Sequence, residues 1–250
     1  MTLNSFKEYE IERWLALHLN HRFSANRLLA SLPEEDLSRL EPFFSLVPLV
    51  AGERLLGVDD EVPAVFFPLE GAIVRLAQIP SGESVELGLV GTEGAVGLPL
   101  ALGGHAAFGL SRVQISGRAA VIGAAAFDEH VRSRRGMLFD RLLRYAGMQL
   151  RLISQLAACH SLHRIEQRLT RCILALADRS ADRATVRVTH DALADFLGVH
   201  RPSVTYAVQA LSSLGLLSAE RRRLIVLNRP ALEQHACECY AMIRKLTEGG

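Results

Sequence analysis

The 250-residue sequence predicts an α+β chain in which a β-rich sandwich or closed barrel is followed by a long helix and then by a winged helix-turn-helix. Three features predict this fold: short β-type runs broken by Gly and Pro, a stretch of sustained helical periodicity, and a carboxyl-terminal pattern of two helices joined by a tight turn. We expect a helical extension (1–24), a β domain (25–127), a long helix (128–163) and a winged helix-turn-helix domain (164–250).

The amino-terminal extension is amphipathic, and a helix is expected over Glu8–Leu19. It has neither the basic start nor the apolar core of a signal peptide. No apolar run in the chain reaches the roughly 18 to 20 residues that span a bilayer. We therefore expect a cytoplasmic protein that does not enter the membrane.

The β domain is predicted from short apolar runs separated by turn residues. The runs are Leu46–Val50, Ala64–Phe67, Ala72–Gln78, Ser84–Val90, Arg112–Ser116 and Ala119–Ile122. Gly and Pro interrupt them, notably at Pro68–Gly71 and Gly117, and Ile79–Glu83 has the composition of a hairpin turn. Short strands at such spacing are typical of a sandwich or closed barrel.

The long helix carries a repeat with the 4, 3, 4, 3, 4 spacing of a coiled-coil seam. Its members are Leu138, Leu142, Tyr145, Gln149, Leu152 and Leu156. We expect a second copy of the chain to cover this seam, which makes the protein a homodimer. The alternative is one amphipathic helix packed on its own barrel. A further helix is expected over Arg164–Ala177.

The helix-turn-helix is predicted from residues 189–217, THDALADFLGVHRPSVTYAVQALSSLGLL. Thr189 can cap a first helix, and Gly198 supplies the left-handed conformation of a short interhelical turn. The second helix starts near Arg201 and Pro202, since proline is tolerated in a first turn. Its two faces differ in polarity, with Val204, Val208 and Leu211 on one side and Arg201, Thr205 and Gln209 on the other.

Such a helix suits the DNA major groove, where an arginine can bond both acceptors of a guanine edge. A hairpin with the arginines 221–223 at its tip follows, which predicts a wing whose basic side chains contact phosphates. Ser161–Arg229 holds eleven Arg and Lys residues against six Asp and Glu, although the net charge of the whole chain is only +1. A basic carboxyl-terminal part fits a DNA-binding module.

Four segments together resemble the Crp/Fnr family of transcription regulators. They are GLVGTEGAVG (88–97), HRIEQRLTRCILALADR (163–179), LADFLGVHRPSVT (193–205) and ALEQHACECY (231–240). The resemblance covers about residues 27–240 and implies that the β domain is a double-stranded β-helix, a jelly-roll-like β-roll that acts as a sensor. It implies a homodimer on a two-fold symmetric operator in double-stranded DNA. It also implies RNA polymerase as a partner and a small-molecule effector coupled through the dimer helix to the recognition helix, 200–213.

The resemblance places Arg201 where many members have a guanine-reading arginine. Pro202 and Tyr206 stand where the cyclic-AMP receptors of the family often have a glutamate and a second base-contacting arginine, so the half-site should differ from theirs. The residues expected to contact DNA are Arg201, Ser203, Thr205, Tyr206, Gln209, His200, Thr189, Arg221 and Arg222.

The effector is not identified by the resemblance. Cyclic-AMP receptors hold the nucleotide phosphate with a Gly-Glu segment and an Arg-Ser or Arg-Thr pair; here Leu98 replaces the acid and the order Ser111-Arg112 is reversed. Cyclic AMP is therefore not expected, and Arg112 is either a contact for another anion or an outward arginine on a strand. The pocket residues proposed from the sequence are Gly97, Leu98, Ser111, Arg112, Ile153 and Ser154.

The four cysteines give no metal-finger pattern, and reduced thiols are expected. None precedes Cys159, so the amino-terminal iron–sulfur cluster of oxygen-sensing relatives is not expected. Cys237 and Cys239 would diverge on a helix and make a poor chelate. His160 and His163 beside Cys159 are assigned to packing rather than to a metal or haem, because nothing nearby in the sequence completes a ligand set.

An enzyme is excluded by the lack of a nucleophile with an adjacent base, a phosphate loop or a metal-ligand motif, so no catalytic residue is proposed. Two hypotheses remain. The first is a dimeric DNA-binding regulator. The alternative is a ligand-binding or protein-interaction module of the same fold that no longer binds DNA.

Overall fold

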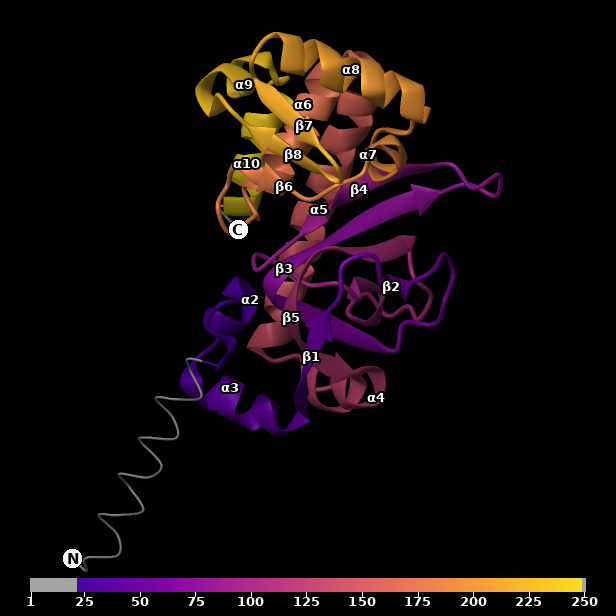
Figure 1. Cartoon of the computed structure of the whole chain (residues 1–250). Coiled ribbons are helices and arrows are strands. Elements are labelled where there is room, and N and C mark those ends of the chain that lie inside the picture. The colour runs from indigo at the N-terminus through magenta and orange to yellow at the C-terminus, as the bar shows by residue number, and fades with distance from the viewer. Residues whose placement is uncertain (1–21, 249–250) are drawn as a thin grey trace, which may run out of the picture.

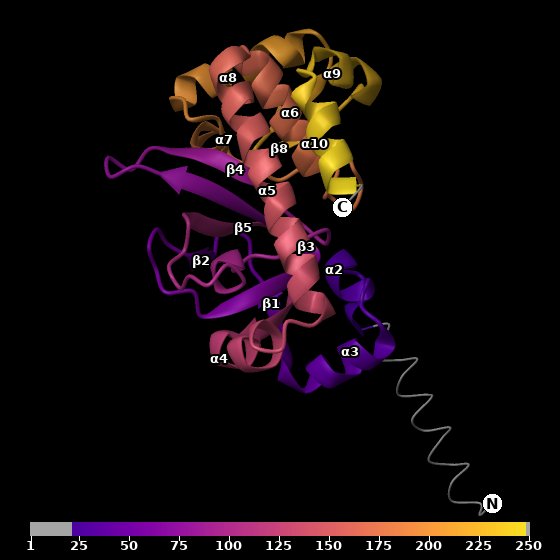
Figure 2. The same ribbon diagram turned by 180° about the vertical axis from the view of Figure 1, so that it is seen from behind.

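The computed structural model describes residues 22–248. Figures 1 and 2 show a β domain at one end, a mostly helical carboxyl-terminal domain at the other, and helix α5 (Met137–Leu162) running along both. The helix expected over Glu8–Leu19 lies outside the described residues. Within residues 22–248, every helix is too short or too polar to cross a membrane.

The β domain is built on antiparallel strands in the order β1-β5-β3-β4, with β2 paired to β5. The strands are β1 (Phe44–Leu49), β2 (Arg54–Leu56), β3 (Ala64–Gln78), β4 (Ser84–Val90) and β5 (Leu110–Gly123). Helices α2 (Arg27–Ala30), α3 (Glu34–Leu40) and η1 (Glu41–Phe43) precede them, and η2 (Leu98–Leu100) lies between β4 and β5. The predicted hairpin turn is confirmed, since the amide of Ile79 donates to the carbonyl of Glu83 at 3.0 Å.

Strands β3 and β5 are each longer than predicted, because the chain bends at the expected breaks instead of ending there. Register shifts mark β3 at Pro68–Gly71. A Cβ atom on Gly71, whose φ is +81°, would lie 2.3 Å from the carbonyl oxygen of Ile115, and one on Gly117 would lie 2.2 Å from that of Glu70. The two glycines therefore let bulged strands approach closely, which glycine permits within a sheet.

Helix α5 begins later than the predicted start of helical periodicity at Asp128. Extended backbone at Gly136 precedes it, and the residues before that form α4 (Ala124–Phe127) and the π-helical turn η3 (Asp128–Arg132). The helix ends at Leu162, and two extended residues, His163 and Arg164, separate it from the next helix.

The predicted dimer seam on α5 is wrong, because the chain itself covers it. Leu138, Leu142, Tyr145, Gln149, Leu152 and Leu156 are all buried within the described residues. Leu142 lies in the apolar core of the β domain, the Gln149 amide donates to the Tyr145 hydroxyl at 2.7 Å, and Leu152 packs against Gly88 of β4. The spacing identified the buried face of the helix, and the alternative of a helix packed on its own barrel is what the structure has.

The carboxyl-terminal domain combines helices with a three-stranded sheet of order β6-β8-β7. Its elements are α6 (Ile165–Ala177), β6 (Thr185–Val186), α7 (His190–Leu197), α8 (Arg201–Ser213), β7 (Leu217–Glu220), β8 (Arg223–Val226), α9 (Arg229–His235) and α10 (Cys239–Glu248). Their apolar faces enclose one core that includes Leu193, Phe196 and Val208.

Candidate nucleic-acid interface

Helices α7 and α8 form the helix-turn-helix that the sequence predicts. The Thr189 hydroxyl accepts the amide of Ala192 at 3.1 Å, which caps α7 and directs this side chain to its own backbone. Gly198 adopts φ +61° and ψ +46° at the turn. His200 occupies the N-cap position of α8, but its side chain makes no capping hydrogen bond. Pro202 lies in the first turn of α8, where proline costs no helical hydrogen bond.

The two faces of α8 differ as expected. Its back is buried through Val204, Ala207, Val208 and Leu211. Its outer face leaves Gln209 exposed, Tyr206 72% exposed and the Arg201 side chain 65% exposed. Figures 1 and 2 place α8 at the outer end of the molecule, with α7 between it and β4. The outer face of α8 is therefore accessible to the major groove of DNA.

Contacts between α7 and α8 hold two of the predicted DNA-contacting side chains. The Arg201 Nε lies 3.5 Å from a carboxylate oxygen of Asp191, and both side chains are exposed. The Thr205 hydroxyl lies 3.0 Å from Nδ1 of His190 and 3.3 Å from the carbonyl oxygen of Arg201. His190 was missed from the sequence, because only the crossing of the helices brings it beside Thr205. Ser203 is half-buried on the same helix.

The wing is the β7–β8 hairpin. Arg221 and Arg222 form its turn, are exposed, and Arg222 has a positive φ of 60°. Arg223 is the first residue of β8 and forms an ion pair with Glu220 across the hairpin. Two of the three consecutive arginines are thus available at the tip for phosphate contacts.

The structure brings together three of the six predicted effector residues, and it places the other three elsewhere. Gly97, Leu98 and Ser111 line a cavity of about 20 Å³, which has room for one water molecule. Arg112 instead points to the helix-turn-helix, where its guanidinium lies 3.1 Å from the carboxylate of Asp195. Ile153 and Ser154 lie on α5, outside the lining of this cavity, and the Ser154 hydroxyl donates to the carbonyl of Leu150.

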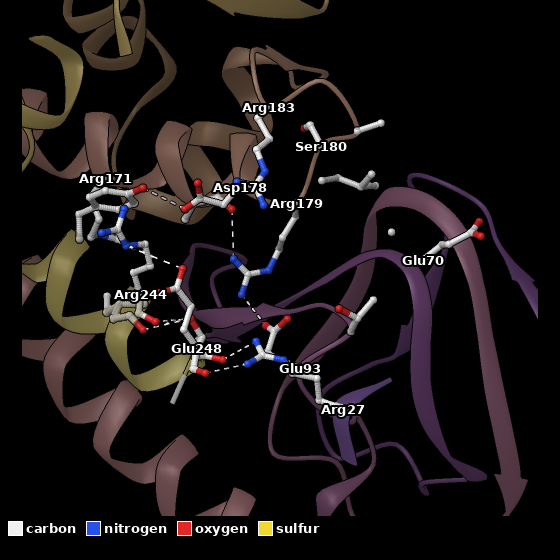
Figure 3. Close-up of a pocket in the computed structure, with 18 of the residues that line it drawn as sticks. Arg27, Glu70, Glu93, Arg171, Asp178, Arg179, Ser180, Arg183, Arg244 and Glu248 are labelled. Carbon is white, nitrogen blue, oxygen red and sulfur yellow. Dashed lines mark hydrogen bonds and ion pairs between the residues drawn. The ribbon is translucent and has the colours of Figure 1, made fainter. Parts of the chain in front are cut away.

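A much larger cavity, of about 900 Å³, lies between the β domain and the carboxyl-terminal domain. Figure 3 shows charged side chains from both domains around it, with Arg179, which follows α6, directed toward Glu93, which follows β4. Its arginines are Arg27, Arg171, Arg179, Arg183, Arg229 and Arg244. Within residues 22–248, Arg183 forms no ion pair.

Two ion pairs with little solvent exposure connect the domains at this cavity. A guanidinium nitrogen of Arg171 lies 3.0 Å from a carboxylate oxygen of Glu86, and the two side chains are 1% and 3% exposed. Burial lowers the pKa of Arg171, but the Glu86 carboxylate raises it above its usual value. Burial likewise raises the pKa of Glu93, yet the Arg179 guanidinium and the Gly91 amide bring it below its usual value.

The structure corrects the expectation that Cys159 and His163 lack further ligands nearby. Cys237 and Cys239 lie beside them, and the ligand atoms of the four residues are all within 4.8 Å of one another. The Cys-x-Cys pair does not diverge as predicted, because Cys237 precedes α10 and only Cys239 belongs to it. Spacing alone cannot reveal such a cluster, since 78 residues separate Cys159 from Cys237.

Comparisons with known proteins agree with this geometry. Residues 167–235 match the family described as the Crp-like helix-turn-helix domain. No curated protein sequence matches the chain.

The solved structures that are similar to the chain include three regulators. FixK2 from Bradyrhizobium japonicum is 16% identical with a TM-score of 0.65, and the match covers 78% of this chain and 98% of FixK2. The global regulator CLP from Xanthomonas campestris is 14% identical with a TM-score of 0.65, and the match covers 78% of this chain and 100% of CLP. TTHB099, a CRP-family transcriptional regulator from Thermus thermophilus, is 24% identical with a TM-score of 0.62, and the match covers 76% of this chain and 96% of TTHB099. At these identities the likeness shows the fold, which joins a β-rich domain, a long helix and a helix-turn-helix with a small sheet. The chain therefore shares its fold with these proteins, and residues 167–235 match a Crp-like helix-turn-helix domain.

Proposed function

We propose that the chain acts as a homodimer that reads a two-fold symmetric DNA operator with helix α8. The observation that carries the proposal is the exposed outer face of α8, with the Arg201 guanidinium in its first turn and an apolar back that anchors the helix. An arginine so placed can bond a guanine edge in the major groove, while Arg221 and Arg222 contact phosphates. Contact with RNA polymerase follows from the family resemblance.

The dimer interface that we propose is the exposed face of α5, opposite the buried one. A row with heptad spacing lies there: Leu143, Gly147, Leu150, Ser154, Ala157 and Ser161. Leu150 is 68% exposed, which is unusual for a leucine at the centre of a 26-residue helix. Small residues around it allow a second α5 to approach closely. A second copy of the chain is therefore the occupant that fits this face.

We also place the effector in the interdomain cavity rather than in the β domain. The support is its volume of about 900 Å³ and the side chain of Arg183, which forms no ion pair within the described residues and can bind an anionic group beside the five carboxylates of the lining. Its walls include Glu93 and Arg179, so a ligand there would act directly on the contacts between the domains. A thermal-shift comparison of nucleotides and dicarboxylates tests this placement, with stabilisation expected in the wild type and reduced in Arg183→Ala.

The experiment that tests DNA reading is selection of binding sites from random double-stranded DNA by the full chain, followed by binding measurements at several salt concentrations. We expect an enriched sequence with two-fold symmetry and an affinity that falls steeply with salt. The alternative function, a module of the same fold without DNA binding, predicts no enriched sequence. Enrichment of a single asymmetric site would contradict the dimer but not DNA binding.

A further inference from the structure

Three cysteines and one histidine meet where the end of α5 contacts the start of α10. Cys159 and His163 come from α5 and its C-cap, and Cys237 and Cys239 come from the segment that opens α10. We propose that these four side chains bind one thiophilic metal ion, for which Zn²⁺ is the reference ion. Three thiolates and one imidazole are a ligand set of structural zinc sites.

The distances fit a single tetrahedral ion. With Zn–S bonds of about 2.3 Å and a Zn–N bond of about 2.05 Å, two thiolates lie about 3.8 Å apart, and a thiolate and an imidazole nitrogen about 3.6 Å apart. The Cys159 and Cys237 sulfurs are 3.6 Å apart, and the Cys239 sulfur is 3.6 Å from Nδ1 of His163. Both pairs therefore match edges of the coordination tetrahedron. A disulfide needs its sulfurs at about 2.05 Å.

The backbone explains why the four groups converge. Cys159 and His163 are one helical turn apart, so both face the same side of α5. Cys237 lies in the connection after α9, while Cys239 is the first residue of α10, so the change in backbone conformation directs both thiols to one point. The segment Cys237–Cys239 thus acts as a short clamp across the end of α5.

Groups around the cluster orient its ligands. The Nε2 of His163 lies 3.2 Å from a carboxylate oxygen of Glu238, which leaves Nδ1 directed to the thiols. A carboxylate on the far nitrogen of a histidine ligand is the common arrangement around bound zinc. The Gln155 amide donates to the Cys239 sulfur at 3.0 Å. The histidine and one thiol are therefore both held in place by neighbouring side chains.

Burial completes the site. All three cysteines of the cluster are buried and form a small core with Ile243 packed against them. His163 lies at the edge, with its side chain 18% exposed, which leaves a route for an ion to enter. A bound ion would link the end of α5 to the carboxyl-terminal helices, and its binding free energy would stabilise the folded chain.

The test uses the full chain, purified with a phosphine reductant and stripped of metal. We expect one Zn²⁺ per chain, a Co²⁺ form with the intense visible absorption of tetrahedral thiolate coordination, and a higher melting temperature with either ion. Glu238→Gln should weaken Zn²⁺ binding by about 10- to 100-fold, and Cys159→Ser, Cys239→Ser and His163→Gln by more than that.

The matched controls are Cys172→Ser and His160→Gln, which remove a cysteine and a histidine outside the cluster and should keep the wild-type affinity and stoichiometry. His163 and Glu238 lie at the edge of the protein, so their variants test the site even if a cysteine variant fails to fold. The proposal is overturned if the stripped wild type takes up no Zn²⁺, if the Co²⁺ form is octahedral, if affinity survives in His163→Gln, or if Cys159 and Cys237 form a disulfide instead of binding the ion.

Discussion

The amino end of α8, which we propose reads DNA bases, offers very few side chains for base contacts. Arg201 carries the only guanidinium in its first turn, and Pro202 beside it offers a base neither donor nor acceptor. The ion pair of Arg201 with Asp191 is exposed on both sides and therefore contributes little to stability. The guanidinium can thus leave the carboxylate for a guanine edge at small cost.

Replacing Arg201 with alanine should weaken operator binding by about 1–3 kcal/mol and relax discrimination at one base pair per half-site. The measurement is a binding titration against the selected operator and its single-base variants. Arg39→Ala is the control, because Arg39 is an exposed arginine on α3 of the β domain with carboxylate partners of its own. Unchanged affinity and base preference in Arg201→Ala would show that α8 does not dock as proposed.

The contribution of Glu93 to the free energy of unfolding should depend on pH. Its pKa is lowered in the folded chain, so its contribution to stability is complete above the unfolded value of about 4.3 and is lost as the pH falls through the folded value. Glu93→Gln should lower the free energy of unfolding by about 1–3 kcal/mol at pH 7.

Urea denaturation between pH 7 and pH 3 measures this contribution. The wild type should lose stability more steeply than Glu93→Gln below about pH 4.3, so the two curves should converge in acid. Glu70→Gln is a control in an exposed ion pair with Arg118. Parallel curves for the wild type and Glu93→Gln would mean that the carboxylate of Glu93 does not stabilise the domain contact.

At the scale of secondary structure, the sequence predicts best the elements that local chemistry determines. The cap at Thr189, the left-handed Gly198 and the apolar positions of α8 all lie within 29 residues, and the helix-turn-helix follows from them. The predicted dimer seam is wrong because heptad spacing identifies a buried helix face but not the element that packs against it. The sequence predicts two short strands in place of each of β3 and β5, because Gly and Pro occur at bends within a strand as well as at strand ends.

The exposed row on α5 gives a prediction for this element. Leu150→Glu should convert the proposed dimer to a monomer, since two carboxylates would meet in the interface where desolvation is costly. Analytical ultracentrifugation measures the subunit state. Leu102→Glu is the control, because Leu102 is also exposed but lies in the β domain. A Leu150→Glu dimer of wild-type stability would place the interface elsewhere.

At the scale of the whole molecule, the two domains are held by charges as well as by apolar contact. The Glu86–Arg171 pair lies between β4 and α6 with both side chains buried, and Arg179 repeats the arrangement with Glu93. These contacts join segments about 85 residues apart, so no local pattern in the sequence predicts them. The interdomain cavity was missed for the same reason, because its lining comes from both domains.

Arg171→Ala should lower the free energy of unfolding by about 3–5 kcal/mol, because it leaves the Glu86 carboxylate buried without a partner. The double variant Glu86→Leu with Arg171→Met should recover much of this loss, since it removes both charges and restores volume. Chemical denaturation measures both. Arg39→Ala, which removes exposed ion pairs, is the control. If Arg171→Ala lowered the free energy of unfolding no more than Arg39→Ala does, water would have to reach the Glu86 carboxylate.

The position of α7 constrains how any signal can act. Because α7 rests on β4 while α8 faces outward, the reading surface is already uncovered in the docked arrangement. A signal that acted by uncovering α8 would therefore have no effect, because α8 is already exposed. In the dimer that we propose, an input signal would instead change the spacing and tilt of the two α8 helices, and the extended residues 163–164 are where the angle between α5 and α6 can change.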